Sequence, residues 1–364
     1  MIDAKVLMQL NDKLNLLKSS NRAGNSFGGV NLLFFGDFFQ LPAVSKIDLW
    51  KKKQGKWQQG YDLWRSLNAV VILKQQMRQA DDERYASAMR RIRLHEPTDD
   101  DIALLNSRIG APIPDSDSVP IVVRRHTVRH EINKQRLNDI ASAKAVPILH
   151  CKASILKSNN LTNDRLYRVI QGPRKALADG IPSVIPSAPL LITKNLNYLP
   201  IPLVNGTIVN FFGFATPSET RSAQVIDLPD YLLVKLRDPN TIVHLPNLHP
   251  NVVPILPESF RYDQGHGRWG RLRQFPVTLA YALSDYKCQG QNYDAVRVDL
   301  KKPPTGEASA MSLYVQLSRV RSLNGLSVLR PFYPEELRTP IPQHLKYELQ
   351  WEEEMNEITM QLFQ

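Results

Sequence analysis

The sequence predicts an α/β protein with a mostly parallel sheet and a smaller β module in its second half. Two observations support this class. Short apolar runs alternate with helical periods through residues 1–139, as in a sheet of parallel strands joined by helices. In addition, 13 of the 26 prolines lie between Ile181 and Pro276. Because proline removes a backbone donor and blocks helices, that stretch should consist of loops and short strands.

Helical periodicity marks the first element, residues 1–19, where apolar residues recur every three or four positions. Thr98 with Asp101 three positions later forms a capping-box pattern that opens another helix. Further helices are expected at 81–93, 127–139 and 343–364. Short apolar runs predict strands at 31–35, 70–73, 120–123, 208–214, 231–236 and 241–245.

Composition excludes several classes of protein. Hydrophobic residues make up 43% and charged residues 22% of the 364, so a disordered, collagen-like or coiled-coil chain is excluded. No apolar stretch reaches the roughly 18 residues of a membrane-spanning helix, and the N-terminus lacks the apolar run of a signal peptide. Cys151 and Cys288 are the only cysteines, which excludes a disulfide framework and predicts an intracellular, reducing compartment.

The charge balance favours a polyanionic partner. Lysine and arginine total 46 against 35 aspartate and glutamate, a net charge of +11. Nucleic acid is the natural candidate, although many basic proteins bind none, so charge alone leaves the question open.

Polar residues follow the first two expected strands. Gly36, Asp37 and Gln40 come after the run at 31–35, at the sheet edge where ligands bind in open α/β folds. Arg78 follows the run at 70–73, and its planar guanidinium could reach a phosphate. The simpler interpretations are a strand followed by a turn, and a solvated surface arginine.

Two further segments combine polar groups near the C-terminal end. Lys287, Gln289 and Gly290 could together hold a nucleic-acid backbone, or Gly290 could only end a helix. Arg319 could be a phosphate-directed arginine, or a cation favoured near a helix C-terminus. Cys288 has no evident histidine partner for nucleophilic chemistry. The histidines are scattered, so no metal site of protein ligands is predicted.

The order of these segments resembles the later motifs of superfamily-one DNA helicases. The resemblance is closest to the Pif-one family and, within it, to the Helitron-transposon type. It covers roughly residues 1–330. The segments that carry it are Phe27–Val30, Gly36–Pro42, Gln76–Gln79, Leu191–Leu196, Leu203–Thr207, Tyr286–Gly290 and Tyr314–Val320.

The resemblance implies an ATP-dependent 5′→3′ DNA helicase, with ATP and Mg²⁺ as cofactors and single-stranded DNA as partner. It implies a nuclear location and no membrane. It also implies roles for residues at the motif positions. Nucleotide-binding residues would be Gly36, Asp37, Gln40, Arg78 and Arg319, of which Gln40, Arg78 and Arg319 would be catalytic; DNA-binding residues would be Asn195, Asn205, Lys287, Gln289 and Gly290.

The same resemblance divides the chain into four parts. Residues 1–75 would be the truncated remainder of a first RecA-like domain, and residues 76–206 with 275–335 a second one. Residues 207–274 would be an inserted SH3-like β module, and residues 336–364 a C-terminal amphipathic helix.

One departure from the family pattern affects the expected activity. No Gly-x-x-x-x-Gly-Lys-Ser/Thr sequence occurs in the 364 residues, and Met1 resembles a position just after the family's Mg²⁺-binding Asp-Glu pair. The chain is therefore expected to be inactive alone. The alternative is a non-catalytic remnant that binds single-stranded DNA or docks on another helicase chain. Coding sequence upstream of Met1 would discriminate between these possibilities.

Overall fold

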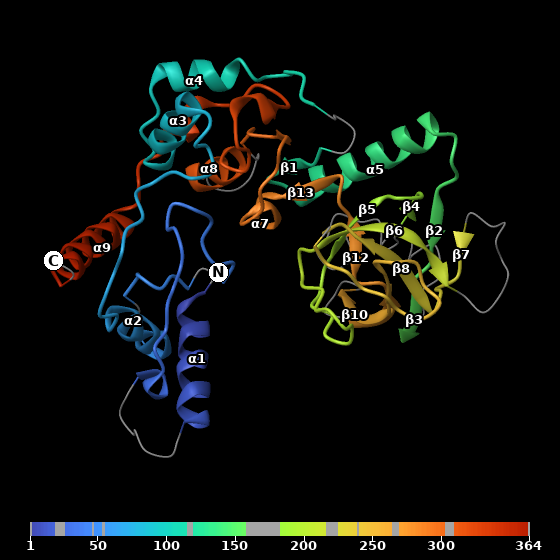
Figure 1. The fold of residues 1–364 in the computed structure, drawn as a ribbon, viewed down its shortest axis with the longest axis horizontal. Helices are drawn as coiled ribbons and strands as arrows, with labels where there is room; N and C mark the ends of the chain where they lie inside the picture. The colour runs from blue at the N-terminus through green and yellow to red at the C-terminus, as the bar shows by residue number, and fades with distance from the viewer. Residues whose placement is uncertain are drawn as a thin grey trace. The chain divides into compact units, whose positions relative to one another are not determined.

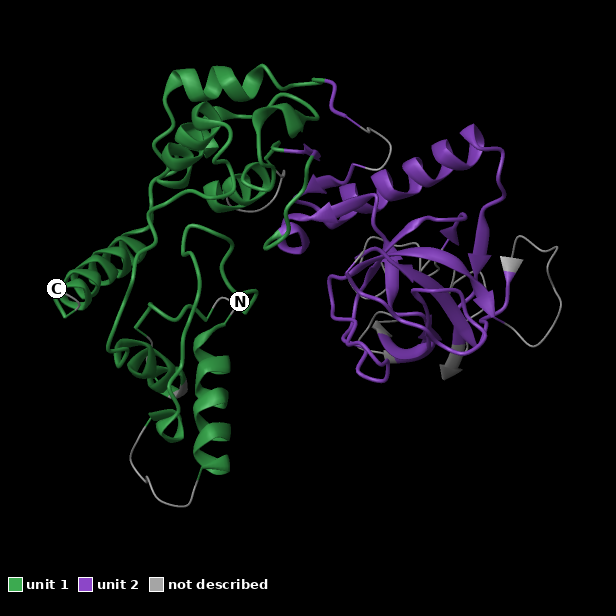
Figure 2. Ribbon diagram, viewed as in Figure 1, with its two compact units in different colours: residues 1–111, 289–294, 300–364 green, residues 112–288, 295–299 purple. Residues whose placement is uncertain are grey.

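The computed structural model divides the chain into two compact units (Figures 1 and 2). Unit 1 comprises residues 1–111, 289–294 and 300–364, and unit 2 comprises residues 112–288 and 295–299. The structure describes residues 2–18, 26–45, 47–52, 55–114, 119–157, 183–215, 225–238, 240–263, 269–302 and 309–362.

Unit 1 is mainly helical. Its helices are α1 (Ala4–Leu17), α2 (Gln58–Arg65), α3 (Glu83–Arg93), α4 (Asp99–Asn106), α8 (Ala310–Leu317) and α9 (Gln343–Gln361). Its strand is β15 (Leu326–Val328), and 3₁₀ turns lie at Ser26–Gly29, Gly55–Trp57, Leu323–Gly325 and Pro334–Glu336.

The local sequence signals for these helices are confirmed. Thr98 and Asp101 form the predicted capping box, because each side chain accepts a hydrogen bond from the other's backbone N–H, at 3.2 and 2.9 Å. Asp3 caps α1 by accepting from the N–H of Val6 at 2.7 Å.

Helices α1 and α2 pack closely around an aromatic core. A Cβ at Gly60 would lie 2.4 Å from the carbonyl oxygen of Ala4, so only glycine allows this approach. The core of this part of unit 1 is formed by Ala4, Leu7, Phe27, Leu49, Leu63 and Trp64.

The prediction of a strand at 31–35 is wrong. The segment is extended, but it does not form a strand. Leu32 and Phe34 pack against the core with Trp64, whereas Leu33 and Phe35 are 86% and 87% exposed. The alternation is that of a half-buried strand. No sheet forms because, among the described residues, none pairs with this backbone.

The prediction of a strand at 70–73 is also wrong. The backbone N–H groups of this segment form hydrogen bonds with side chains instead of with another strand. The N–H of Val70 donates to Oγ1 of Thr359 at 3.0 Å, and that of Ile72 to Oδ1 of Asn356 at 2.9 Å. Side chains of α9 therefore take the place of a neighbouring strand.

Unit 2 contains the parallel strands that the fold class requires. Strand β1 (Ile121–Val123) pairs in parallel with β13 (Ala282–Ser284) on one side and β14 (Val296–Val298) on the other. Helix α5 (His126–Ala143) follows β1, and its Asn133 accepts from the N–H of Ala282 at 2.8 Å. Helix α7 (Asp285–Cys288) follows β13 directly.

The proline-rich stretch contributes most of the β structure of unit 2. One antiparallel sheet has the order β12 (Val277–Leu279), β5 (Pro189–Ile192), β6 (Ile208–Ala215), β8 (Tyr231–Leu236), β9 (Val252–Ile255). Two smaller sheets have the orders β10 (Glu258–Asp263), β11 (Trp269–Gln274), β3 (Ser154–Lys157), and β4 (Ser183–Val184), β2 (Leu149–Cys151), β7 (Val225–Ile226).

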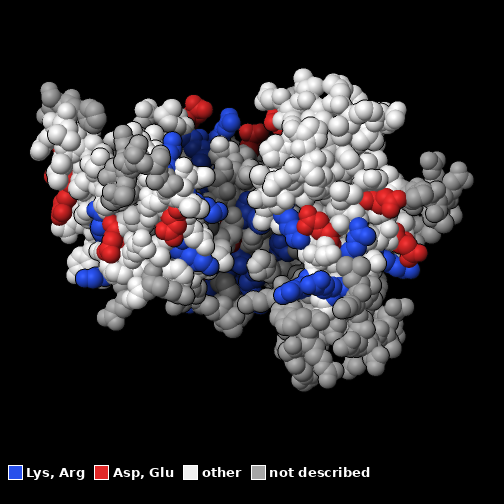
Figure 3. Space-filling view, turned by 90° about the horizontal axis from the view of Figure 1, so that it is seen from below, with Lys and Arg blue, Asp and Glu red and all other residues white. Residues whose placement is uncertain are grey.

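The strand predictions in this stretch succeed at two of three places. Strands at 208–214 and 231–236 are confirmed, whereas 241–245 is not a strand. Within the described ranges, no helix is long and apolar enough to cross a membrane. Basic side chains are exposed on both units, with acidic ones among them (Figure 3).

Candidate functional site

The segment Gln76–Gln79 is tied to the chain that follows α8 in unit 1. Arg78 donates through Nη1 to the carbonyl oxygen of Ser318 at 2.9 Å. Gln79, which is fully buried, donates through Nε2 to the carbonyl oxygen of Val320 at 2.5 Å. Two motif segments about 240 residues apart therefore lie side by side, with Arg319 between the two accepting carbonyls.

Residues 289–294 join the same cluster. Arg78 donates through Nε to Oδ1 of Asn292 at 2.6 Å, and Arg319 through Nη1 to the carbonyl oxygen of Gln291 at 3.4 Å. The N–H of Tyr293 donates to the carbonyl oxygen of Arg319 at 3.0 Å. Two segments that carried the resemblance, Gln76–Gln79 and Tyr314–Val320, thus meet the residues that directly follow a third, Tyr286–Gly290, in unit 1.

Arg319 is completely buried just beyond the C-terminus of α8. Its Nε donates to the carbonyl oxygen of Val315 at 2.7 Å, and Nη2 to Oγ of Ser318 at 2.6 Å. A cation at this place is stabilised by the free carbonyls and the dipole of the helix. A contact with a phosphate would require the guanidinium to leave these partners.

The loop Gly36–Gln40 reaches the same cluster through Gln289. The Gln40 carboxamide donates from Nε2 to Oδ2 of Asp37 at 3.3 Å, and its Oε1 accepts from Nε2 of Gln289 at 3.3 Å. Gly36 is exposed, and no atom lies within 4 Å of a Cβ built there. The predicted residues Asp37, Gln40 and Gln289 are therefore in direct contact.

Tyr314 of α8 lies among the charges of this cluster. Burial raises the pKa of its hydroxyl, and the negative charge of Asp37 raises it further, whereas Arg93, Arg319 and Arg78 lower it. The hydroxyl of Tyr314 therefore lies within the reach of three guanidinium groups and one carboxylate of the cluster.

Sequence reasoning missed three members of this cluster: Gln79, Asn292 and Arg93. The side chain of Arg93 forms an ion pair with Asp37, with 2.9 Å between Nη2 and Oδ1. Its signal was hidden because α3 carries four arginines, at 84, 90, 91 and 93, three of them in its last turn, and they look alike in sequence. Only their partners distinguish them.

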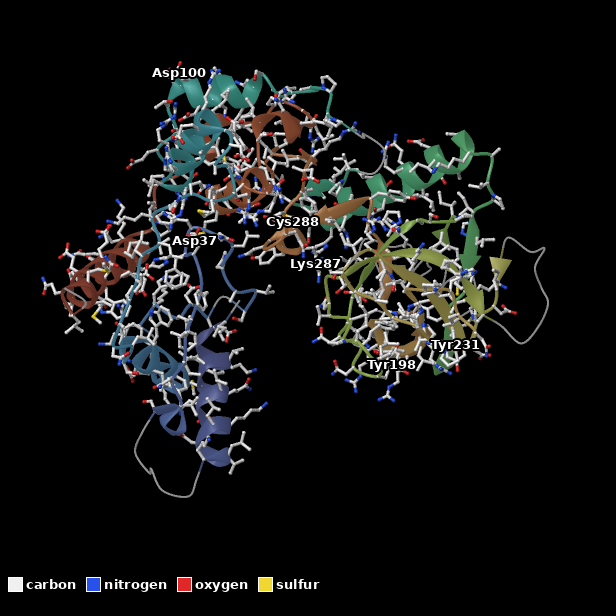
Figure 4. The ribbon with its side chains drawn as sticks, in the orientation of Figure 1. Asp37, Asp100, Tyr198, Tyr231, Lys287 and Cys288 are labelled. Atoms are coloured by element: carbon white, nitrogen blue, oxygen red, sulfur yellow. The ribbon has the colours of Figure 1, made fainter. Side chains whose placement is uncertain are left out.

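Three of the predicted DNA-binding residues form a hydrogen-bonded chain in unit 2. The N–H of Asn205 donates to Oδ1 of Asn195 at 2.8 Å, and Oδ1 of Asn205 accepts from Nζ of Lys287. Asn195 and Asn205 flank an antiparallel bridge between Leu196 and Leu203, which brings the two asparagines together. Figure 4 labels Lys287, whose side chain leaves the short helix α7.

The ammonium group of Lys287 is held in a basic environment. Partial burial lowers its pKa, and the guanidinium of Arg129 lowers it further. An anion bound there would offset both effects, because it favours the charged ammonium.

Gly290 has a φ of +82°. This is the left-handed conformation in which a glycine commonly ends a helix, as one interpretation of the sequence predicted.

The cysteines and the acidic residues provide no further centre. Cys288 is fully buried, and its Sγ donates to the carbonyl oxygen of Asp285 at 3.1 Å. Among the residues that the structure describes, no group of three or more His, Cys, Asp or Glu side chains could hold a metal ion.

Comparison with curated proteins identifies the relatives of this chain. It is 23% identical to the ATP-dependent DNA helicase PIF1 of Candida albicans, over 90% of this chain and 42% of that protein. It is 25% identical to PIF1 of Xenopus laevis, over 97% of this chain and 49% of that protein. It is 24% identical to the ATP-dependent DNA helicase RRM3 of Saccharomyces cerevisiae, over 93% of this chain and 51% of that protein. Its homologues are DNA helicases of the Pif1 and RRM3 kind. No family model matches, and the chain spans about half the length of these relatives.

Solved Pif1 structures share the α/β fold. The crystal structure of Candida albicans Pif1 has a TM-score of 0.69 at 23% identity and covers 97% of this chain and 74% of its own. Bacteroides Pif1 bound to single-stranded DNA has a TM-score of 0.66 at 18% identity, covering 98% and 74%. Pif1 from Bacteroides in complex with ADP-AlF3 and single-stranded DNA has a TM-score of 0.66 at 19% identity, and it also covers 98% of this chain and 74% of its own. These likenesses confirm the predicted RecA-like α/β class with its parallel sheet.

Proposed function

We propose that this chain is the C-terminal portion of a Pif1-like ATP-dependent 5′→3′ DNA helicase. The observation that carries the proposal is the convergence in unit 1 of the loop 36–40, the segment 76–79, residues 289–294 and the end of α8. A helicase motor needs such a junction, because groups that meet nucleotide must be linked to groups that meet DNA. The Helitron-transposon type is proposed from the motif residues alone.

The remaining parts of the proposal rest on family resemblance. The four-part domain division, the SH3-like nature of residues 207–274 and the nuclear location belong to it, whereas the reducing compartment is proposed from the small number of cysteines. Of the β module, residues 216–224, 239 and 264–268 lie outside the described ranges. Cys151 and Cys288 are both buried, which is compatible with a reducing compartment.

For the nucleotide, Gly36, Asp37, Gln40, Arg78 and Arg319 would line the side of the terminal phosphate. The guanidinium of Arg78 suits an anion, but these residues do not form a complete site for ATP with Mg²⁺. The sequence has no phosphate-loop lysine, and the described residues hold no carboxylate cluster for the metal. We therefore propose that residues 1–364 bind nucleotide poorly and do not turn it over by themselves.

We expect purified residues 1–364 to show no ATP hydrolysis stimulated by single-stranded DNA. The reason is that no group in the sequence replaces the phosphate loop. Phosphate release would be followed with and without oligothymidine, and Arg319→Ala would be the control for contaminating activity. Turnover of ~1 s⁻¹ that Arg319→Ala abolishes would contradict the expectation.

For the DNA, Asn195, Asn205, Lys287, Gln289 and Gly290 would contact the backbone of a single strand. The asparagine pair fixes the position of the Lys287 ammonium, and the basic surroundings of that ammonium favour an anion. Contacts to phosphate carry no base information, so this binding should tolerate any sequence.

Lys287→Ala should weaken binding to single-stranded DNA, because it removes a contact with one phosphate. The log–log slope of affinity against salt should also become shallower by about 0.7, the contribution of one neutralised phosphate. Fluorescence anisotropy on labelled oligothymidine, from roughly 50 to 200 mM salt, would measure the affinity and the slope. Lys235→Ala is the matched control, since Lys235 is exposed on β8 of the same unit. Equal affinities of the two variants would remove Lys287 from the proposed interface.

A second function is favoured by one observation. Leu33 and Phe35 are 86% and 87% exposed on an extended segment whose Leu32 and Phe34 pack against the core. Such a surface suits docking on another polypeptide, including another helicase chain. On this alternative the chain would be a non-catalytic remnant. Sedimentation of Phe35→Ser and wild-type protein would test it, because docking between copies should weaken in the variant.

A further inference from the structure

An arginine of α3 anchors the loop that carries Gln40. Arg93 approaches Asp37 through two nitrogens, with Nη2 to Oδ1 at 2.9 Å and Nε to Oδ2 at 3.3 Å. The guanidinium also lies over the ring of Phe39, 4.3 Å from its centroid, and that ring is 3% exposed. The paired contact fixes the orientation of the carboxylate as well as its position.

The two neighbouring arginines of α3 do not share this task. Arg90 pairs with Glu83 on its own helix at 2.6 Å, and Arg91 pairs with Asp101 of α4 at 2.7 Å. Among the described residues, Arg93 pairs with the loop 36–40, whereas Arg90 and Arg91 pair with α3 and α4. Its contact is therefore a property of the loop rather than of a generally basic helix.

Asp37 passes this constraint to the rest of the loop. Its Oδ1 accepts from the N–H of Phe39 at 3.1 Å, its Oδ2 accepts from Nε2 of Gln40 at 3.3 Å, and its carbonyl accepts from the N–H of Gln40 at 3.0 Å. Gln40 in turn accepts from Nε2 of Gln289 at 3.3 Å. Gln289 stands two positions after Lys287 in the sequence.

We propose that Arg93 is a positioning residue for the DNA-binding segment 287–290. It fixes the Asp37 carboxylate, the carboxylate orients the Gln40 side chain, and Gln40 holds the carboxamide of Gln289. The inference rests on the proposed binding of single-stranded DNA. Because Arg93 acts through other residues, its loss lowers affinity without removing a phosphate contact.

Anisotropy with labelled oligothymidine tests this positioning role. Arg93→Ala should raise Kd about tenfold, while the salt slope stays at the wild-type value because the same phosphates are still neutralised. Arg93→Lys should recover part of the affinity, since it keeps the charge but not the paired geometry. Arg84→Ala, at an exposed arginine of the same helix, should bind like wild type. Gln289→Ala added to Arg93→Ala should cost less than Gln289→Ala alone, because both act along one path.

Hydrogen exchange on the free protein gives a second readout that does not need DNA. Arg93→Ala should speed exchange of the Gln40 amide and of residues 289–291, and Arg84→Ala should not. Unchanged exchange, binding like Arg84→Ala, or a salt slope reduced by about 0.7, would each overturn the positioning role. Wild-type protein that binds no oligothymidine would overturn the proposed DNA binding itself, together with the part of this inference that depends on it.

Discussion

Glu348→Ala should lower the free energy of unfolding of unit 1 by about 3–5 kcal/mol, the typical cost of removing one partner from a buried ion pair. Glu348 of α9 is fully buried. Its Oε1 accepts from Nε1 of Trp64 at 2.6 Å, and its Oε2 accepts from Nη2 of Arg65 at 2.5 Å. The variant leaves a buried indole N–H and a largely buried guanidinium without their acceptor.

Urea titration followed by tryptophan fluorescence would measure this loss. The probe reports mainly on unit 1, because Trp50, Trp57, Trp64 and Trp351 lie there and only Trp269 lies in unit 2. Glu353→Ala, at an exposed glutamate of the same helix, removes the same charge without the contacts. If both variants unfold at the same urea concentration, the buried pair does not stabilise α9 on unit 1.

Glu352→Gln should stabilise unit 1 at pH 8 and leave it unchanged near pH 4. Burial raises the pKa of Glu352 to about 7, with the negative charges of Glu348 and Asp37 adding to the effect and Arg93 and Arg65 opposing it. The folded protein therefore holds this proton more tightly than the unfolded chain does. The stability linked to it is present below the unfolded value of 4.5 and is lost as the pH rises through about 7.

The expected gain at pH 8 is about 1–3 kcal/mol, reduced from the full linkage value because the carboxylate is only partly buried. Thermal unfolding of wild type, Glu352→Gln and Glu353→Gln between pH 4 and 8 would show it. The wild type and the Glu353→Gln control should lose stability across this range, and Glu352→Gln should lose less. Parallel curves for all three proteins would contradict the raised pKa.

Local signals in the sequence predicted much of the fold. The Thr98–Asp101 capping box, the limits of β8 and the C-terminal helix depend on neighbours in the chain, so the pattern of residues contains the answer. The runs at 31–35 and 70–73 have the composition of strands, but a strand needs a partner. Composition cannot say whether one is present.

In the candidate site, too, the order of residues along the chain could be predicted, whereas contacts between distant residues could not. Resemblance selected Gln40, Arg78, Lys287 and Arg319 from the order of the motifs, and the structure brings Gln40 to Gln289 and Arg78 to the backbone beside Arg319. Neither the burial of Arg319 nor the pairing of Arg93 with Asp37 follows from any local pattern. The roles of these residues toward nucleotide and DNA remain predictions.

The contacts of α9 with the residues at 70 and 72 have a consequence for synthesis on the ribosome. The residues that complete unit 1, Asn356 and Thr359, are made after all of unit 2. At roughly 5–20 residues per second, the first 111 residues wait about 12–50 s for them. Unit 2 can therefore fold while the backbone N–H groups of Val70 and Ile72 still lack their partners on α9.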